Sequence, residues 1–235
     1  MKAPRTHEAT AFSLVELLVV IAVIAVMTAL AVPAFNSVRG AGSLAKAASD
    51  ISGTLQQARS YAMSQNTYVY VGLQEVDVIQ PTTTDGTGRV VIAAVASKSG
   101  TRPANVASES VAISKAQSLD GAHMTNAAAL AADGGMADRE SNLTDLSLPA
   151  SASASQFQFT WPLGGTAKYR FAKVIEFDPQ GVARLQTNAG GGSQVEHGIE
   201  IALFPARGNT AAATDANQAS IQINGITGAV RIFRP

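Results

Sequence analysis

The apolar pattern of this chain begins with one long run near the N-terminus. From Leu17 to Phe35 the sequence contains no charged residue, and only Thr28 is mildly polar. An α-helix rises about 1.5 Å per residue, so a stretch of this length is sufficient to cross the hydrocarbon core of a bilayer. The pattern therefore predicts a transmembrane helix within residues 12–35.

A second helical pattern follows the first. Its apolar members recur at alternating spacings of four and three residues, whereas residues such as Lys46 and Asp50 fall on the other faces; the apolar members are Leu44, Ala48, Ile51, Leu55, Ala58 and Ala62. This spacing places one apolar stripe along a helix. We expect residues 36–64 to continue the helix as an amphipathic segment whose stripe packs on a globular head.

The remaining residues, 65–235, show short runs rich in β-branched and aromatic residues, separated by turn residues. Residues 97–155 are weakly patterned, and we expect an irregular insertion there with a short helix near 126–132. The predicted strands lie at 66–73, 89–96, 156–161, 169–178, 182–187, 199–204, 220–224 and 229–234, and the last two form a hairpin through 225–228. The expected fold class is α+β, with a long N-terminal helix packed on a β-sheet head.

Glu16 is the one acidic residue at the leading edge of the apolar run. A carboxylate near mid-bilayer costs roughly 2.5–3.5 kcal/mol on insertion scales, so its presence needs an explanation. One explanation is a capping box, because residues 13–16 (SLVE) fit the pattern [ST]-x-x-[DE]. An acidic side chain in the first turn also suits the helix dipole.

A secretory signal peptide is an alternative explanation of the whole segment. Lys2 and Arg5 precede the apolar run, and residues 29–31 (ALA) form a small-x-small cleavage site. Cleavage there would release a soluble protein that begins near Val32.

Residues 11–16 (AFSLVE), followed by the apolar run, resemble the class III signal of type IV pilins and pseudopilins. The resemblance implies a leader over residues 1–11, cleavage by a prepilin peptidase between Ala11 and Phe12, and N-methylation of Phe12. Ala11 departs from the glycine that is usual before the cut. Pro33 stands where helices of this family commonly carry a kinking proline. The implied architecture is the pilin fold, with the long helix packed on an antiparallel sheet.

Further short segments sharpen the resemblance. Residues 55–62 (LQQARSYA) with Asn66, residues 175–181 (IEFDPQG) and residues 221–232 look like elements of the minor pseudopilins of the GspH and FimT family. The D-type pilin-like protein of the Verru_Chthon gene cassette is a related candidate. These matches cover the helix and three β segments but not the insertion.

The resemblance also implies a function and a location. The chain would be a minor pilin or pseudopilin, a structural subunit of a type II secretion pseudopilus, a type IV pilus or a related fibre. It would cross the inner membrane once, with the N-terminus cytoplasmic and the head periplasmic, and then enter a filament. Its partners would be sibling pilins, the prepilin peptidase, membrane lipid and the inner-membrane assembly platform. Glu16 would pair with the freed amino group of Phe12 on a neighbouring subunit, which neutralises two groups that are costly in lipid.

The composition of the chain gives no support to nucleic-acid binding and excludes chemistry that needs cysteine. The 17 Lys and Arg residues balance the 17 Asp and Glu residues, so no global basicity favours nucleic acid. The chain has no cysteine, which excludes disulfides and thiol catalysis. Only 14% of the residues are charged, a composition that suits packing against like subunits.

The candidate chemical motifs are weak. The three histidines, His7, His123 and His197, lack metal-ligand spacing, and the last two are expected to be solvated loop residues. The acids Asp133, Asp138 and Glu140 match no calcium loop, so solvated acids are expected. Neither residues 190–192 (GGG) nor 164–168 (GGTAK) form a phosphate-binding motif. We therefore predict no enzyme activity, no cofactor and no metal site.

The C-terminal hairpin keeps one alternative open. Some FimT-like proteins bind DNA through a Gly-Arg-x-Arg pattern at this position. Here Ala229 replaces the first arginine, while Arg231 and Arg234 remain and Arg207 could lie near them. Two or three arginines would give weak phosphate contacts, and solvated arginines at a terminus are the simpler interpretation.

Overall fold

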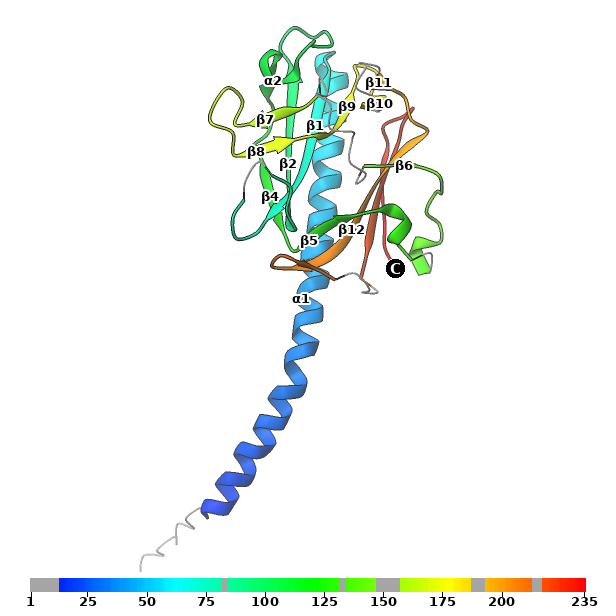
Figure 1. Ribbon diagram of the computed structural model, residues 1–235. Helices are drawn as coiled ribbons and strands as arrows, with labels where there is room; N and C mark the ends of the chain where they lie inside the picture. Colours follow the sequence, from blue (N-terminus) through cyan, green and yellow to red (C-terminus); the bar gives the residue numbers. More distant parts are fainter. Residues whose placement is uncertain (1–12, 82–83, 132–133, 147–156, 187–192, 213–216) are drawn as a thin grey trace, which may run out of the picture. The chain divides into compact units, whose positions relative to one another are not determined.

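The computed structural model describes residues 13–81, 84–131, 134–146, 157–186, 193–212 and 217–235, except for the side chains of residues 30–41, 186, 193 and 194 (Figure 1). The chain divides into two compact units, Met1–Arg39 and Gly40–Pro235. Helix α1, Leu14–Gln65, is 52 residues long and contributes to both units. The predicted helix and its amphipathic continuation therefore form a single α-helix.

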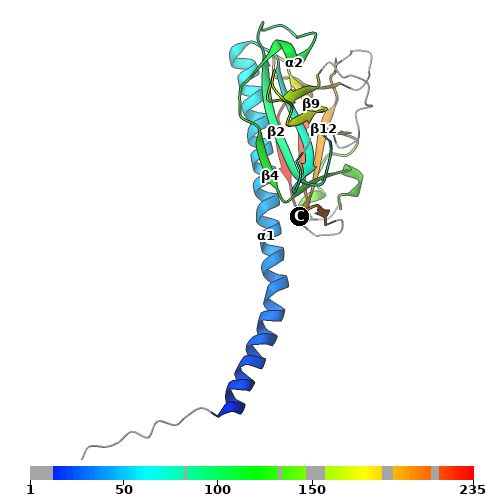
Figure 2. The same cartoon turned by 60° about the vertical axis from the view of Figure 1, so that its left-hand side comes forward.

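The amphipathic part of α1 packs on the strands of the second unit (Figure 2). All six residues of the predicted stripe are buried, each with a relative exposure of 0–1%. The helix ends where Asn66 adopts a positive φ of 50° and the Thr67 amide donates to the Ala62 carbonyl at 3.0 Å. This left-handed residue satisfies a terminal carbonyl and turns the chain toward the first strand.

The first sheet has seven strands that pair antiparallel, in the order β11-β10-β9-β1-β2-β3, with β4 also on β2. Its register places Val71 of β1 opposite both Ala94 of β2 and Ile175 of β9. The strands are β1 Val69–Asp77, β2 Gly88–Ser97, β3 Ser110–Ala112, β4 Gln117–Asp120, β9 Lys173–Phe177, β10 Ala183–Gln186 and β11 Ser193–Gln194.

The second sheet has six strands in the order β13-β12-β14-β15, with β5 and β6 also on β12. Its pairings are antiparallel except that β6 runs parallel to β12. The strands are β5 Ala122–Thr125, β6 Thr144–Asp145, β12 Gly198–Arg207, β13 Thr210–Ala211, β14 Ala219–Asn224 and β15 Val230–Phe233. A separate hairpin consists of β7 Phe159–Trp161 and β8 Tyr169–Phe171, and the short helices are α2 Val106–Glu109, η1 Ala127–Ala129 and η2 Gly134–Met136.

Two apolar cores lie on opposite faces of the first sheet. The main core joins the buried stripe of α1 to residues of both sheets, such as Val71, Ile92 and Ile221. The second core is aromatic and includes Tyr70, Phe157, Phe159 and Phe171. Successive residues of a strand point to opposite faces, which is why Tyr70 and Val71 enter different cores.

The structure confirms the α+β class, with an N-terminal helix packed on antiparallel sheets. The Pro-Gln-Gly turn after residue 178 and the final hairpin are also as predicted, and the Gly181 amide donates to the Asp178 carbonyl at 2.8 Å.

The predicted strand 169–178 is wrong, because it is two strands in different sheets, β8 and β9. The cause is visible at Gly72, where a Cβ atom would lie 2.5 Å from Phe171 Cβ and 2.8 Å from Phe159 Cζ. The missing side chain lets the β7–β8 hairpin lie directly on β1.

The segment 97–155, predicted to be an irregular insertion, contributes four short strands to the two sheets in its described part. Strands β3 and β4 extend the first sheet from β2, and β5 and β6 pair with β12 of the second sheet. Short strands that derive their stability from a partner carry little pattern of their own. The short helix predicted near 126–132 is a 3-10 turn over Ala127–Ala129, capped by the Asn126 side chain, and residue 132 lies outside the described residues.

Among the residues whose side chains the structure describes, no helical stretch is both long and apolar enough to cross a membrane. The predicted segment 12–35 includes residue 12 and the side chains of 30–35, which lie outside that part.

Candidate functional site

The first turn of α1 is closed by reciprocal hydrogen bonds between Ser13 and Glu16. The Ser13 amide donates to Glu16 Oε2 at 2.9 Å, and the Glu16 amide donates to Ser13 Oγ at 3.2 Å. This is the capping box predicted from the sequence, and it satisfies amides that no helical carbonyl can reach. The Glu16 carboxylate therefore starts the helix, whatever else it binds.

Behind Glu16 the helix presents an apolar surface on every side. The large apolar side chains between Leu14 and Met27 are 49–81% exposed within this chain. The hydroxyl of Thr28, the residue after Met27, donates to the carbonyls of Ile24 and Ala25 at 2.9 Å, so it adds little polarity. A helix that is apolar all round is stable against lipid or other apolar helices, not against water.

The remaining predicted processing and helix-shaping residues are Ala11, Phe12 and Pro33. Ala11, Phe12 and His7 lie outside the described residues. Pro33 lies within the bounds of α1, but its side chain is not among those that the structure describes. The kink predicted at Pro33 therefore stays a prediction.

Three segments that carried the family resemblance meet at one corner of the second unit. A Cβ atom on Gly228 would lie 2.1 Å from the Gly181 carbonyl oxygen and 2.9 Å from Arg59 Cδ, and one on Gly181 would lie 3.1 Å from Arg59 Nε. Both glycines have positive φ, +64° and +81°. Arg59 of α1 thus packs against two turns that only glycine allows to come this close. The residues of these three segments therefore have a structural role, because they pack the helix against two turns.

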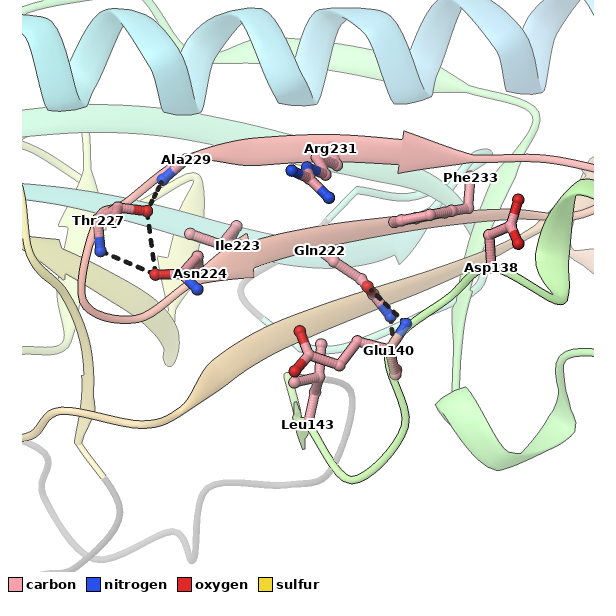
Figure 3. Close-up of a pocket in the computed structure, with 10 residues that line it drawn as sticks. All are labelled: Asp138, Glu140, Leu143, Gln222, Ile223, Asn224, Thr227, Ala229, Arg231 and Phe233. Atoms are coloured by element: carbon pink, nitrogen blue, oxygen red, sulfur yellow. Dashed lines mark hydrogen bonds between the residues drawn. The ribbon is translucent and has the colours of Figure 1, made fainter.

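The C-terminal hairpin, β14 and β15, borders a cavity of about 320 Å³ whose lining includes Arg231 and Phe233 (Figure 3). On the facing loop, Asp138 and Glu140 line the same cavity. The Gln222 side chain holds that loop, because it accepts from the Glu140 amide at 3.1 Å and donates to the Glu140 carbonyl at 2.9 Å. Arg231 therefore shares its cavity with two carboxylates, which weaken the attraction of a phosphate to this arginine.

The other C-terminal arginines lie in different surroundings. The Arg234 guanidinium donates to the Ala45 carbonyl of α1 at 2.8 Å. Arg207 stands at the end of β12, opposite Thr210 of β13. Arg234 thus holds the C-terminus to the helix, a contact that the sequence motif did not suggest.

His123 is not the solvated loop residue that was expected. It lies on β5, and its Nδ1 is 2.9 Å from Oε1 of the buried Glu75 on β1. Glu75 also accepts from the amides of Gly88 and Met124 at 2.8 and 3.1 Å. This carboxylate therefore ties the two sheets together, and its 48-residue separation from His123 hid the pair from sequence reasoning.

His197 is exposed as expected, with its Nε2 2.6 Å from Glu140 Oε1. Within the described part of the chain, no group of three or more His, Cys, Asp or Glu residues could hold a metal ion. Asp133 and residues 190–192 lie outside that part, and residues 164–168 form an exposed connection between β7 and β8.

Buried carboxylates also anchor the two segments that sequence reasoning treated as one insertion. Glu200 of β12 accepts two bonds from Arg139 Nη1, at 2.9 and 3.0 Å, which hold the loop before β6 against the second sheet. Glu176 of β9 accepts a bond from Arg102 Nη2 at 2.5 Å. Burial raises the pKa of the Glu176 carboxyl above its usual range, although the Arg102 guanidinium opposes the shift. Tertiary contacts alone create these pairs.

Comparisons of the chain with protein-family models, with curated proteins and with solved structures find no match. Helix α1 combines a capped, apolar start with a stripe that is buried on the sheets.

Proposed function

We propose that this chain is a membrane-anchored minor pilin or pseudopilin, a structural subunit of a type II secretion pseudopilus or a type IV pilus-like filament. In this proposal the fold is that of type IV pilins, and α1 anchors the protein in the inner membrane before it enters the filament. The β-rich head faces the periplasm. Sibling pilins, the prepilin peptidase and the assembly platform are the partners.

The observation that carries the proposal is the surface of α1 behind the Ser13–Glu16 capping box. Large apolar side chains are exposed all round the helix, yet the same helix continues into a stripe that is fully buried on the sheets. A signal sequence that is discarded has no reason to continue as the central helix of the head. A filament subunit has that reason, because lipid and then neighbouring helices would cover the apolar surface.

DNA binding is the first rival function. The carboxylates of Asp138 and Glu140 beside Arg231, and the bond from Arg234 to Ala45, argue against a phosphate-binding face at the hairpin. Arginines that bind phosphate are effective when free of competing carboxylates. We therefore favour a structural subunit over a nucleic-acid-binding module.

The proposal is tested by the N-terminus of the native, membrane-extracted protein. Peptide mass spectrometry should identify N-methylated Phe12 as the first residue, with the apolar segment retained. A mature protein that begins near Val32 would instead establish an exported globular protein and overturn the proposal. A gel-shift assay with the Arg231→Ala and Arg234→Ala variants tests the DNA alternative separately, and arginine-dependent binding would support that rival.

A further inference from the structure

Residues 98–109, called the strap below, cross the outer face of the first sheet between β2 and β3. The strap contains α2, and its Pro103 and Val106 are buried. Val106 belongs to the second core, together with Tyr70 and Phe157. The strap therefore covers the aromatic core on the side of the sheet opposite α1.

One charged contact joins the strap to the centre of the sheet, in addition to the bond that Ser97 Oγ, at the end of β2, donates to the Thr101 carbonyl at 2.6 Å. Arg102 Nη2 donates to Glu176 Oε1 at 2.5 Å, across 74 residues of sequence, and the Arg102 guanidinium lies 5.3 Å from the Tyr68 ring centroid. The Arg102 side chain is 36% exposed, whereas that of Glu176 is 0% exposed. The Arg102 guanidinium can thus become solvated when the contact breaks, whereas the Glu176 carboxyl remains buried.

The buried end of this contact holds two polar atoms that lack partners. Among the described residues, neither Glu176 Oε2 nor the Tyr70 hydroxyl has a hydrogen-bond partner, and both are buried. Tyr70 of β1 lies directly opposite Glu176 of β9 in the sheet register. An unpartnered buried acceptor and donor are each costly, and the Tyr70 hydroxyl is close enough to the Glu176 carboxyl to act on its pKa.

The other charged groups near Glu176 do not replace Arg102. Arg184 of β10 lies opposite Glu176, with its Nε 3.8 Å from Glu176 Oε1. Its Nη2 donates to Asp178 Oδ2 at 3.1 Å, which engages the guanidinium elsewhere. Tyr70, Arg102, Arg184 and, through that bond, Asp178 are the titratable and charged groups around the carboxylate, with Tyr68 beyond Arg102.

We propose that the strap is an acid-released device with two states. In the ionised state Glu176 holds Arg102 and the strap is closed. When Glu176 takes a proton from solvent, the charge that holds Arg102 is lost, while the Tyr70 hydroxyl stays beside the neutral carboxyl. Residues 99–104 then move away with Arg102 in water, which exposes Pro103 and breaks the bond from Ser97 Oγ to the Thr101 carbonyl. Val106 stays in the core, so the strap opens at its Arg102 end.

The environment of the carboxyl moves this switch to a higher pH than that of an exposed glutamate. Burial raises the pKa of Glu176, so it takes up a proton at a higher pH than an exposed glutamate does. Burial and the neighbouring Glu176 charge raise the pKa of Tyr70, so its hydroxyl keeps its proton throughout.

Spin labelling tests the strap directly, because the chain has no native cysteine. Ala104→Cys introduces a single exposed site two residues after Arg102. In the full chain in detergent, the nitroxide spectrum should be immobilised near pH 8 and gain a mobile component toward pH 4, with the ratio of the two changing about tenfold per pH unit around the midpoint.

Variants in the Ala104→Cys background separate the switch from general loosening. Glu176→Gln should be mobile at every pH. Arg102→Gln should also be mobile at every pH. Because Arg102 is partly exposed, this variant tests the proposal even if Glu176→Gln, a buried substitution, fails to fold. Asp120→Asn, which removes the exposed partner of Arg89 at β4, should titrate like the parent. A parent spectrum that does not change with pH, or a folded Arg102→Gln variant that stays immobilised at pH 8, overturns the proposal.

Discussion

The two roles assigned to Glu16, capping α1 and pairing with an amine, can be separated by three substitutions. Glu16→Gln keeps an acceptor oxygen for the Ser13 amide but removes the charge, and glutamine is also accepted in capping boxes. Ser13→Ala removes the hydroxyl that accepts from the Glu16 amide but keeps the charge. Glu16→Ala removes both.

The expected magnitudes differ enough to be measured. Loss of a capping side chain costs about 1 kcal/mol, which corresponds to a factor of about 5 in an equilibrium constant. Loss of one partner from a buried ion pair costs about 3–5 kcal/mol, a factor of at least about 100. If the carboxylate pairs with an amine in the filament, Glu16→Gln should lose incorporation nearly as completely as Glu16→Ala, while Ser13→Ala should lose only several-fold.

The assay compares the amount of each variant in sheared filaments with the amount in the membrane fraction, by quantitative immunoblot. The membrane fraction should be the same for all three variants, because insertion depends on the apolar run. Two results together would refute the pairing and show that the carboxylate acts only as a cap. Glu16→Gln would be incorporated as well as the wild type, and Ser13→Ala would lose as much incorporation as Glu16→Ala.

Three further predictions concern the folded head. Gly228→Ala should lower the free energy of unfolding by at least about 3 kcal/mol, because its Cβ would lie 2.1 Å from the Gly181 carbonyl oxygen. Gly208→Ala, also at positive φ but with no atom within 4 Å of the added Cβ, should cost only about 1 kcal/mol in the same urea titration, and equal losses would contradict the packing argument. Gly53→Ala, in an open position on α1, should raise the thermal midpoint through about 1 kcal/mol of helix propensity, and a fall would be unexpected. Burial raises the folded-state pKa of Glu176 above its unfolded value, so the contribution of Glu176 to stability is full below the unfolded pKa and is lost as pH rises through the folded pKa. Glu176→Gln should remove this decline from urea titrations repeated across that pH window. An unchanged decline would contradict the assignment.

Local sequence was sufficient to predict a feature wherever the contacts of that feature lie within one element or between two adjacent ones. The stripe from Leu44 to Ala62 predicts a buried helix face because every turn repeats the same contact, and each of its residues is buried. The capping box could be predicted because its two members are three residues apart. The closing hairpin could be predicted because its strands are joined by a short turn.

Long-range pairs were beyond the same reasoning. Nothing near Glu176 indicates that Arg102 will reach it, since 74 residues separate them and the bond exists only when the strap folds over the sheet. Likewise, the pattern of residues 169–178 is continuous, yet the absence of a side chain at Gly72 of another strand divides it into β8 and β9.

The sequence by itself determined the helix, its cap, its two faces and the α+β class, because these depend on spacing along a single segment. Only the tertiary structure decided which carboxylates become buried and which arginines or histidine they bind. It also decided that Arg231 shares a cavity with Asp138 and Glu140. The physical reason is the same in each case: desolvation and charge pairing act between segments that the chain brings together only when it folds.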